Sequence, residues 1–142
     1  MDLTEQRHFP ARMAMLAETA AFVEGFCVRH GLSRDAALRI TLIVEELFTN
    51  TIAHGFKGES DTLIGVGLTR HGDHVEVCFE DRAPPYDPME RLRSTPASLG
   101  APVETRPIGG LGMHLVGKLS ESVRYAHEDG MNRLWLVVAC RA

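Results

Sequence analysis

The chain has 142 residues, of which 44% are hydrophobic and 24% charged, as is typical of a globular protein of one domain. Its formal net charge of -4 argues against a general nucleic-acid binder, whose surface is basic. No apolar segment approaches the roughly 18 residues of a membrane span, and the N-terminus lacks a signal-peptide core. The sequence therefore predicts a soluble cytoplasmic protein that binds neither nucleic acid directly nor a membrane.

The cysteines point to the same compartment. Cys27, Cys78 and Cys140 are odd in number, widely spaced and without a Cys-x-x-Cys pair. This pattern favours reduced, buried thiols over disulfides or a zinc site.

The first part of the chain predicts a strand followed by two helices. Residues 3–9 should form a short edge strand, and a helix should follow over about 11–30. Gly31 then ends this helix as a C-terminal glycine cap. The second helix should begin after Ser33, a good N-cap residue, and end at Gly55.

The remaining elements are two predicted hairpins and a third helix. Strands over 62–70 and 74–80 should form the first hairpin, joined by a turn that contains glycine. A helix is expected over 109–119, and strands over 122–127 and 133–139 should close the chain as the second hairpin.

Residues 82–108 interrupt this regular pattern, because six of the seven prolines lie there. Long irregular segments inside compact domains are usually functional or disordered, and lids are the commonest functional kind. We therefore predict a lid over 82–108. The element order predicts an α+β fold in which residues 1–142 form one two-layer α/β sandwich, with helices on one face of a mixed sheet.

Three polar side chains interrupt the apolar face of the second predicted helix. Glu46, Asn50 and His54 follow one another at i, i+4 and i+8, so they stack along one helix edge. A buried carboxylate or carboxamide is costly unless water, a metal, a ligand or the backbone bonds it. A solvated helix edge with a satisfied buried Asn explains the pattern equally well when this helix is considered alone.

Asp81 is a second candidate for a functional residue. It has the same strand parity as Val77 and Phe79, so its side chain should point toward the core. There it would accept a hydrogen bond from a donor such as the exocyclic amine of a ligand. The alternative is a turn-forming Asp ahead of two prolines.

The turn Gly109-Gly110-Leu111-Gly112 opens the third predicted helix and offers backbone amides to a phosphate. It is not a P-loop, because Leu119 stands where Ser or Thr must reach magnesium. It is not a dinucleotide fingerprint either, because Leu115 replaces the last small residue and no strand immediately precedes it. The alternative is a flexible hinge before a helix.

In this order, the three patterns resemble the ATP-binding fold of gyrase, histidine kinases and MutL, known as the Bergerat or GHKL fold. Within that fold the chain is most similar to the bacterial anti-sigma-factor serine kinases, which bind sigma factors and phosphorylate anti-anti-sigma proteins. The matching segments span nearly the whole chain: Glu46-Leu-Phe-Thr-Asn50-Thr-Ile-Ala-His54-Gly55, Glu80-Asp81-Arg-Ala-Pro-Pro-Tyr-Asp87-Pro88 and Gly109-Gly-Leu-Gly112-Met-His-Leu-Val.

The resemblance implies ATP and Mg²⁺ as cofactors and gives the matched residues their roles. Asn50 would ligate the Mg²⁺ that bridges the phosphates, Glu46 would be the catalytic base, and Asp81 would accept the adenine amine. The other matched positions would contact the nucleotide beneath the lid: His54, Ala83, Gly109, Gly110, Gly112 and Met113.

The expected function is that of an ATP- and Mg²⁺-dependent protein serine kinase, an anti-sigma regulatory factor acting on an anti-anti-sigma partner. The resemblance also suggests a homodimer. An ATP-binding module that sequesters a partner without phosphoryl transfer is the alternative, and a nucleotide-independent interaction module is a third. Glu46 favours the kinase, because binding alone needs no general base. The sequence departs from the family at Ala83, where many members carry Gly, and at Asn132-Arg133, where a hydroxyl residue is expected near adenine.

Overall fold

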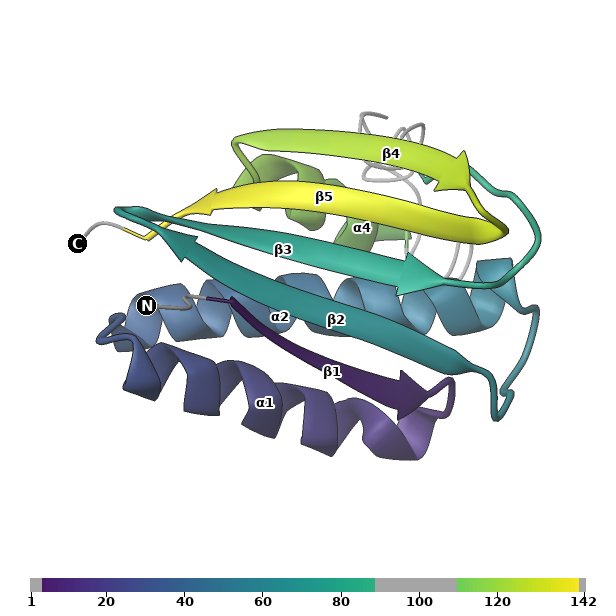
Figure 1. Cartoon of the computed structure of the whole chain (residues 1–142), viewed down its shortest axis with the longest axis horizontal. Helices are drawn as coiled ribbons and strands as arrows, with labels where there is room; N and C mark the ends of the chain where they lie inside the picture. Colours follow the sequence, from purple (N-terminus) through teal and green to yellow (C-terminus); the bar gives the residue numbers. More distant parts are fainter. Residues whose placement is uncertain (1–3, 89–109, 141–142) are drawn as a thin grey trace.

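The computed structural model describes residues 4–88 and 110–140. One layer is a five-stranded sheet, and helices cover one of its faces (Figure 1), as the predicted α+β sandwich requires. No helix in these ranges is long and apolar enough to cross a lipid bilayer. In chain order the elements are β1 (Thr4–Pro10), η1 (Met13–Met15), α1 (Leu16–Arg29), α2 (Arg34–Asn50), η2 (Thr51–Gly55), β2 (Leu63–His71), β3 (His74–Asp81), α4 (Gly110–Leu119), β4 (Ser122–Glu128) and β5 (Met131–Ala139).

The five strands form an antiparallel sheet, so the expectation of a mixed sheet is wrong. The strand order is β1-β2-β3-β5-β4, and each neighbouring pair is antiparallel. Strands β3 and β4 are both antiparallel to β5 and so run in the same direction, which would make them a parallel pair if they were neighbours. Because β5 lies between them, that pair does not form.

Local signals set the ends of α1 and α2 as predicted. Gly31 has a φ of +67°, and the Leu32 amide donates to the Cys27 carbonyl at 2.9 Å, which is the Schellman geometry of a glycine cap. The Ser33 hydroxyl oxygen accepts from the Ala36 amide at 3.1 Å and so caps α2.

Two predicted helix segments differ from the α-helices expected. The first helix begins later than residue 11, because Arg12 has an extended backbone, with φ −131° and ψ 140°, and the Ala11 amide donates to the Thr62 carbonyl at 3.0 Å. The second helix continues beyond Asn50 as a π-helix, in which the Phe56 amide donates to the Thr51 carbonyl at 2.9 Å. Short π segments within helices frequently occur at functional sites.

A hydrophobic core fills the space between the sheet and the helices. Alternate residues of β3 and β5 are buried, as the two-residue period of a strand predicts. The Phe9 ring packs edge to face on Phe22 and Phe48, with centroids 6.1 and 6.4 Å apart. The buried set includes Asp81 at the end of β3 and Asn132 at the start of β5, so two polar side chains face inward at one end of the core.

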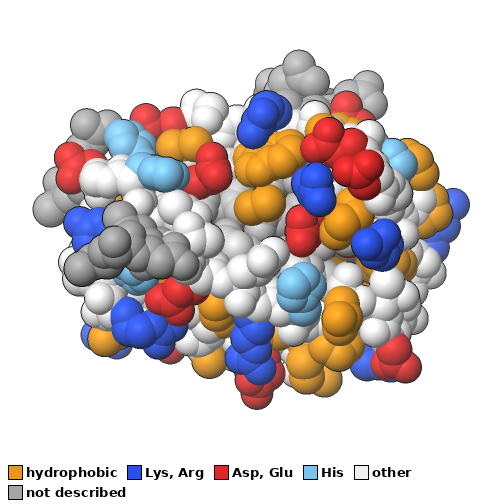
Figure 2. Space-filling view, viewed as in Figure 1, with side chains coloured by type: hydrophobic (Ala, Val, Ile, Leu, Met, Phe, Trp, Pro, Cys, Tyr) orange, Lys and Arg blue, Asp and Glu red, His pale blue; other side chains and the backbone are white. Residues whose placement is uncertain are grey.

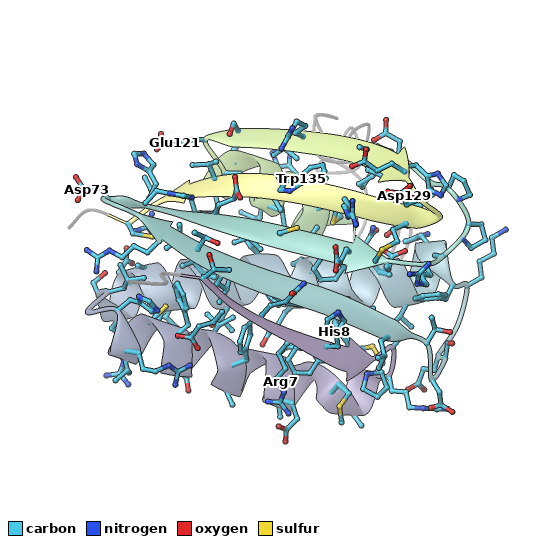
Figure 3. The ribbon with its side chains drawn as sticks, in the orientation of Figure 1. Arg7, His8, Asp73, Glu121, Asp129 and Trp135 are labelled. Carbon is cyan, nitrogen blue, oxygen red and sulfur yellow. The ribbon has the colours of Figure 1, made fainter. Side chains whose placement is uncertain are left out.

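The opposite face of the sheet carries charged and histidine side chains interspersed with hydrophobic ones (Figure 2). His8 on β1 and Trp135 on β5 lie on this face (Figure 3), and the Arg124 guanidinium stacks 4.1 Å from the centroid of the Trp135 ring. Arg133 forms an ion pair with Glu80, with Nε 3.2 Å from Oε2. The Arg133 guanidinium is thus engaged in a surface ion pair.

Candidate functional site

Residues far apart in the sequence meet at the end of the sheet where β3 finishes and β5 begins (Figure 1). Asn50 at the end of α2, Asp81 and Asn132 line one cavity of about 10 Å³, which we call the Asp81 pocket. This space holds about one water molecule, so it is too small for a purine. Its lining consists of Leu47, Asn50, Phe79, Asp81, Tyr86, Pro88, Tyr125, Asn132, Arg133 and Leu134.

Asp81 points inward, as its strand parity predicted, with only 3% of the residue exposed. Its Oδ1 accepts from the Ala83 amide at 2.9 Å and from Asn132 Nδ2 at 3.0 Å. The bond to Ala83 is also that of a turn-forming Asp, so the inward direction of Asp81 and its turn-forming role both hold. Burial raises the pKa of Asp81, and the hydrogen bonds from Asn132 and Ala83 oppose that shift.

Asn132 is the central hydrogen-bonding residue of the pocket, and sequence reasoning noted it only as a departure. It is 4% exposed and lies directly across from Asp81 in the β3–β5 register. Its inward strand parity, shared with Leu134 and Leu136, is the signal that could have identified it. The other half of the departure, Arg133, follows the opposite parity.

Tyr86 closes the Asp81 pocket, and sequence reasoning did not single it out. Its hydroxyl lies 2.9 Å from Thr51 Oγ1 and also bonds the Asn50 side chain. Burial raises the pKa of Tyr86 to about 12. The ring edge packs against Gly55, where an added Cβ would lie 2.9 Å from Tyr86 Cε1. The signal lay in composition, because both tyrosines of the chain, Tyr86 and Tyr125, line this pocket.

Glu46, Asn50 and His54 lie along one helix edge, as their spacing predicted, and line a second cavity of about 170 Å³. Asn50 also lines the Asp81 pocket, so its carboxamide lies between the two spaces. It is 5% exposed and bonded to Tyr86, which makes it a satisfied buried Asn in this structure. The alternative of a solvated helix edge with a satisfied buried Asn therefore holds for Asn50, while His54 and Glu46 are half-buried.

Glu46 contacts the first turn of α4. A Cβ built on Gly112 would lie 1.9 Å from Glu46 Oε2, so the carboxylate occupies the space that a side chain there would need. Burial, and secondarily the charge of Glu45, raises the pKa of Glu46. A carboxylate with a raised pKa is a better proton acceptor than an exposed one, as a general base requires.

The remaining predicted site residues do not all lie at the two cavities. Ala83 is buried beside Asp81, and Met113 is fully buried in the core and lines neither cavity. Gly110 begins α4, whereas Gly109 lies outside the described residues. The lid predicted over 82–108 is likewise described only as far as Pro88.

Comparison with known families shows the family to which the chain belongs. The model of the histidine kinase-like ATPase domain matches residues 9–138, and the chain belongs to that family. Within it, the chain belongs with the serine-protein kinases named RsbW. It is 30% identical to RsbW of Listeria monocytogenes over 124 residues, which cover 87% of this chain and 79% of the relative. It is 28% identical to RsbW of Bacillus cereus over 128 residues, covering 88% and 78%.

Two solved structures share the fold. One is the SiaB–SiaC complex from Pseudomonas aeruginosa, with a TM-score of 0.65 and 15% identity over 94% of this chain and 88% of that chain. The other contains the RsbU and RsbW domains of a Mycobacterium tuberculosis protein, with a TM-score of 0.64 and 17% identity over 97% of this chain and 33% of that chain. These likenesses support the two-layer sandwich itself.

Proposed function

We propose that the protein is an ATP- and Mg²⁺-dependent protein serine kinase that acts as an anti-sigma regulatory factor. The observation that supports this most is the position of Asn50 between the Asp81 pocket and the cavity beside Glu46. A nucleotide with its base at Asp81 and its phosphates toward Gly110 and Gly112 would pass Asn50 and bring its terminal phosphate toward Glu46.

This arrangement suits phosphoryl transfer, which depends mainly on positioning, charge neutralisation and a residue that orients the nucleophile. Glu46 would accept the proton of an attacking serine hydroxyl, and its raised pKa fits that role. Asp81 would bind the exocyclic amine of adenine. Helix α4 would present its N-terminal backbone amides to the phosphates.

The residues present suit one Mg²⁺ held jointly with a nucleotide. Mg²⁺ in such sites usually keeps several waters and takes one or two protein ligands together with phosphate oxygens. Asn50 would supply a carboxamide oxygen, and no cluster of three His, Cys, Asp or Glu competes with it among the described residues. The ion would neutralise phosphate charge during transfer.

The partner we propose is an anti-anti-sigma-type protein that carries the phosphorylated serine. Identity with RsbW over most of the chain supports a protein substrate, and the fold likeness to SiaB, solved in complex with SiaC, supports a protein partner. A sigma factor as a second partner and a homodimer are part of the same proposal. We also propose a cytoplasmic location, where the free cysteines would stay reduced.

A second candidate is an ATP-binding regulator that sequesters its partner without phosphoryl transfer. Tyr86 favours it, because Tyr86 closes the Asp81 pocket and its hydroxyl bonds Thr51, so an entering nucleotide would have to displace it. In that case nucleotide binding would act only as a conformational signal.

One assay distinguishes the kinase from the sequestering regulator. The protein is incubated with γ-labelled ATP, Mg²⁺ and purified anti-anti-sigma-type proteins encoded near its gene. Label transferred to a serine of one of them supports the kinase. ATP-dependent partner binding without label on any partner supports the sequestering regulator, and the absence of ATP binding contradicts both.

A further inference from the structure

We propose that Asn132 is the positioning residue that makes Asp81 selective for the exocyclic amine of adenine. The inference rests on the proposed ATP-binding function and assigns a role to a residue that the family resemblance left as a departure. It follows from the hydrogen bonds around the Asn132 carboxamide.

The orientation of the Asn132 carboxamide is defined by its neighbours. Its nitrogen lies 3.0 Å from Asp81 Oδ1, 3.0 Å from the Ala83 carbonyl and 3.3 Å from the Pro84 carbonyl. All three neighbours are acceptors, so the reversed amide would place its oxygen against three oxygens. The amide oxygen accepts instead from the Tyr125 hydroxyl at 2.5 Å and from the Tyr86 amide at 3.4 Å.

This orientation leaves the two oxygens of Asp81 unequal. The hydrogen bonds that Asp81 receives from described residues, those of Asn132 and Ala83, both fall on Oδ1. Oδ2 is then the oxygen on which a ligand donor can bind. Because Oδ1 is held at two points, the direction of Oδ2 is set before any ligand arrives, which avoids the cost of ordering it on binding.

The same carboxamide also holds the chain that leaves β3. It bonds the carbonyls of Ala83 and Pro84 and the amide of Tyr86, so three successive parts of this segment are anchored to β5. A purely structural anchor would have the same bonds. It would, however, affect every purine nucleotide equally, whereas a positioning role for Asp81 affects only nucleotides that carry the amine.

The test compares ATP with purine riboside triphosphate, which lacks the 6-amino group, by calorimetric titration. For Asn132→Ala we expect ATP to bind about tenfold more weakly, since Asp81 loses a charge-assisted hydrogen bond. Purine riboside triphosphate should bind almost as it does to the parent. Asn132→Asp keeps the side-chain volume but replaces the donor with an acceptor, so it should show the same selective loss if Asn132→Ala does not fold.

Tyr125→Phe is the matched control. It removes the donor to Asn132 Oδ1 and leaves the acceptors around Nδ2 in place, so the preference for ATP should persist. Equal losses for both nucleotides in the Asn132 variants, or no loss for either, would overturn the positioning role while ATP binding by the parent stands. If the parent binds neither nucleotide, the proposed function itself fails.

Discussion

The Glu46 carboxylate occupies the space that a side chain at Gly112 would fill, with Oε2 only 1.9 Å from the position of an added Cβ. Helices α2 and α4 pack against each other, so this contact joins the proposed catalytic base to the helix expected to hold the phosphates. The contact with Glu46 leaves no room for a side chain at position 112. It therefore explains the glycine there, whether or not a phosphate also approaches the backbone.

Gly112→Ala should therefore displace Glu46 and reduce phosphoryl transfer. In an ordinary helix Gly→Ala stabilises by about 0.5–1 kcal/mol, but here the methyl group meets the half-buried Glu46 carboxylate. Gly25→Ala in α1 is the control, because its added Cβ meets only the exposed Arg29 guanidinium, at 2.9 Å. Thermal unfolding should show Gly112→Ala destabilised and Gly25→Ala equal to or more stable than the parent. Equal stabilisation of both variants would contradict the contact.

Glu46→Gln should nearly stop phosphoryl transfer while leaving ATP affinity within about a few-fold, because general-base contributions run about 10²- to 10⁴-fold. Single-turnover transfer to the partner is the measurement. A variant that transfers phosphate as fast as the parent would show that Glu46 is not the base.

Glu46→Gln should also change the pH dependence of stability. Burial raises the pKa of Glu46 in the folded state, so the parent loses stability as pH rises from the unfolded pKa through the folded one. The glutamine variant lacks this loss. Its free energy of unfolding relative to the parent should be larger at pH 7 than below about pH 4, where the unfolded carboxyl is also protonated.

Tyr86→Phe should weaken closure of the Asp81 pocket. The hydroxyl bond to Thr51 lies within a partly buried contact, and its loss should cost about 1 kcal/mol of unfolding free energy without nucleotide. Because the closed pocket is too small for a purine, ATP affinity should stay the same or rise. Thr51→Val removes the same bond, so the double variant should cost less than the two single variants added. Strict additivity in denaturant titrations would contradict this coupling.

The thiols should be unreactive in the folded protein. Burial raises the pKa of Cys27 and of Cys78 to about 11 and also raises that of Cys140. At pH 8, Cys27 and Cys78 should carry more than about 10²-fold less thiolate than a free thiol. Iodoacetamide labelling followed by mass spectrometry should therefore be slow until denaturant is added. Rapid labelling of Cys27 in the folded protein would contradict this.

Local patterns were enough to predict most elements and the inward direction of Asp81. Ser33 marks a helix end through its side-chain hydroxyl and Gly31 through its positive φ, and strand parity places Asp81 without knowledge of the sheet. The partner of Asp81 was not predictable in this way. Asn132 reaches it only because β5 lies between β3 and β4, and the expected mixed sheet did not include that order.

The position of Tyr86 in the pocket was not predictable from local sequence patterns either. Its hydroxyl contacts Thr51, 35 residues away in sequence, and its ring fills the space that Gly55 leaves open. Neither contact has a periodic pattern in the sequence. The proline-rich composition around Tyr86 indicated an irregular segment without indicating which of its side chains enters the pocket.

Titration of the parent protein and Asn50→Ala with ATP, in the presence and absence of Mg²⁺, tests the account most directly, because Asn50 lines both cavities. We expect the parent to bind ATP and to bind it more tightly with Mg²⁺. Asn50→Ala should lose the Mg²⁺-dependent part of the affinity while its circular dichroism spectrum remains that of the parent. A parent that binds no ATP, or an Asn50→Ala variant with the same Mg²⁺ dependence as the parent, would contradict the proposed site.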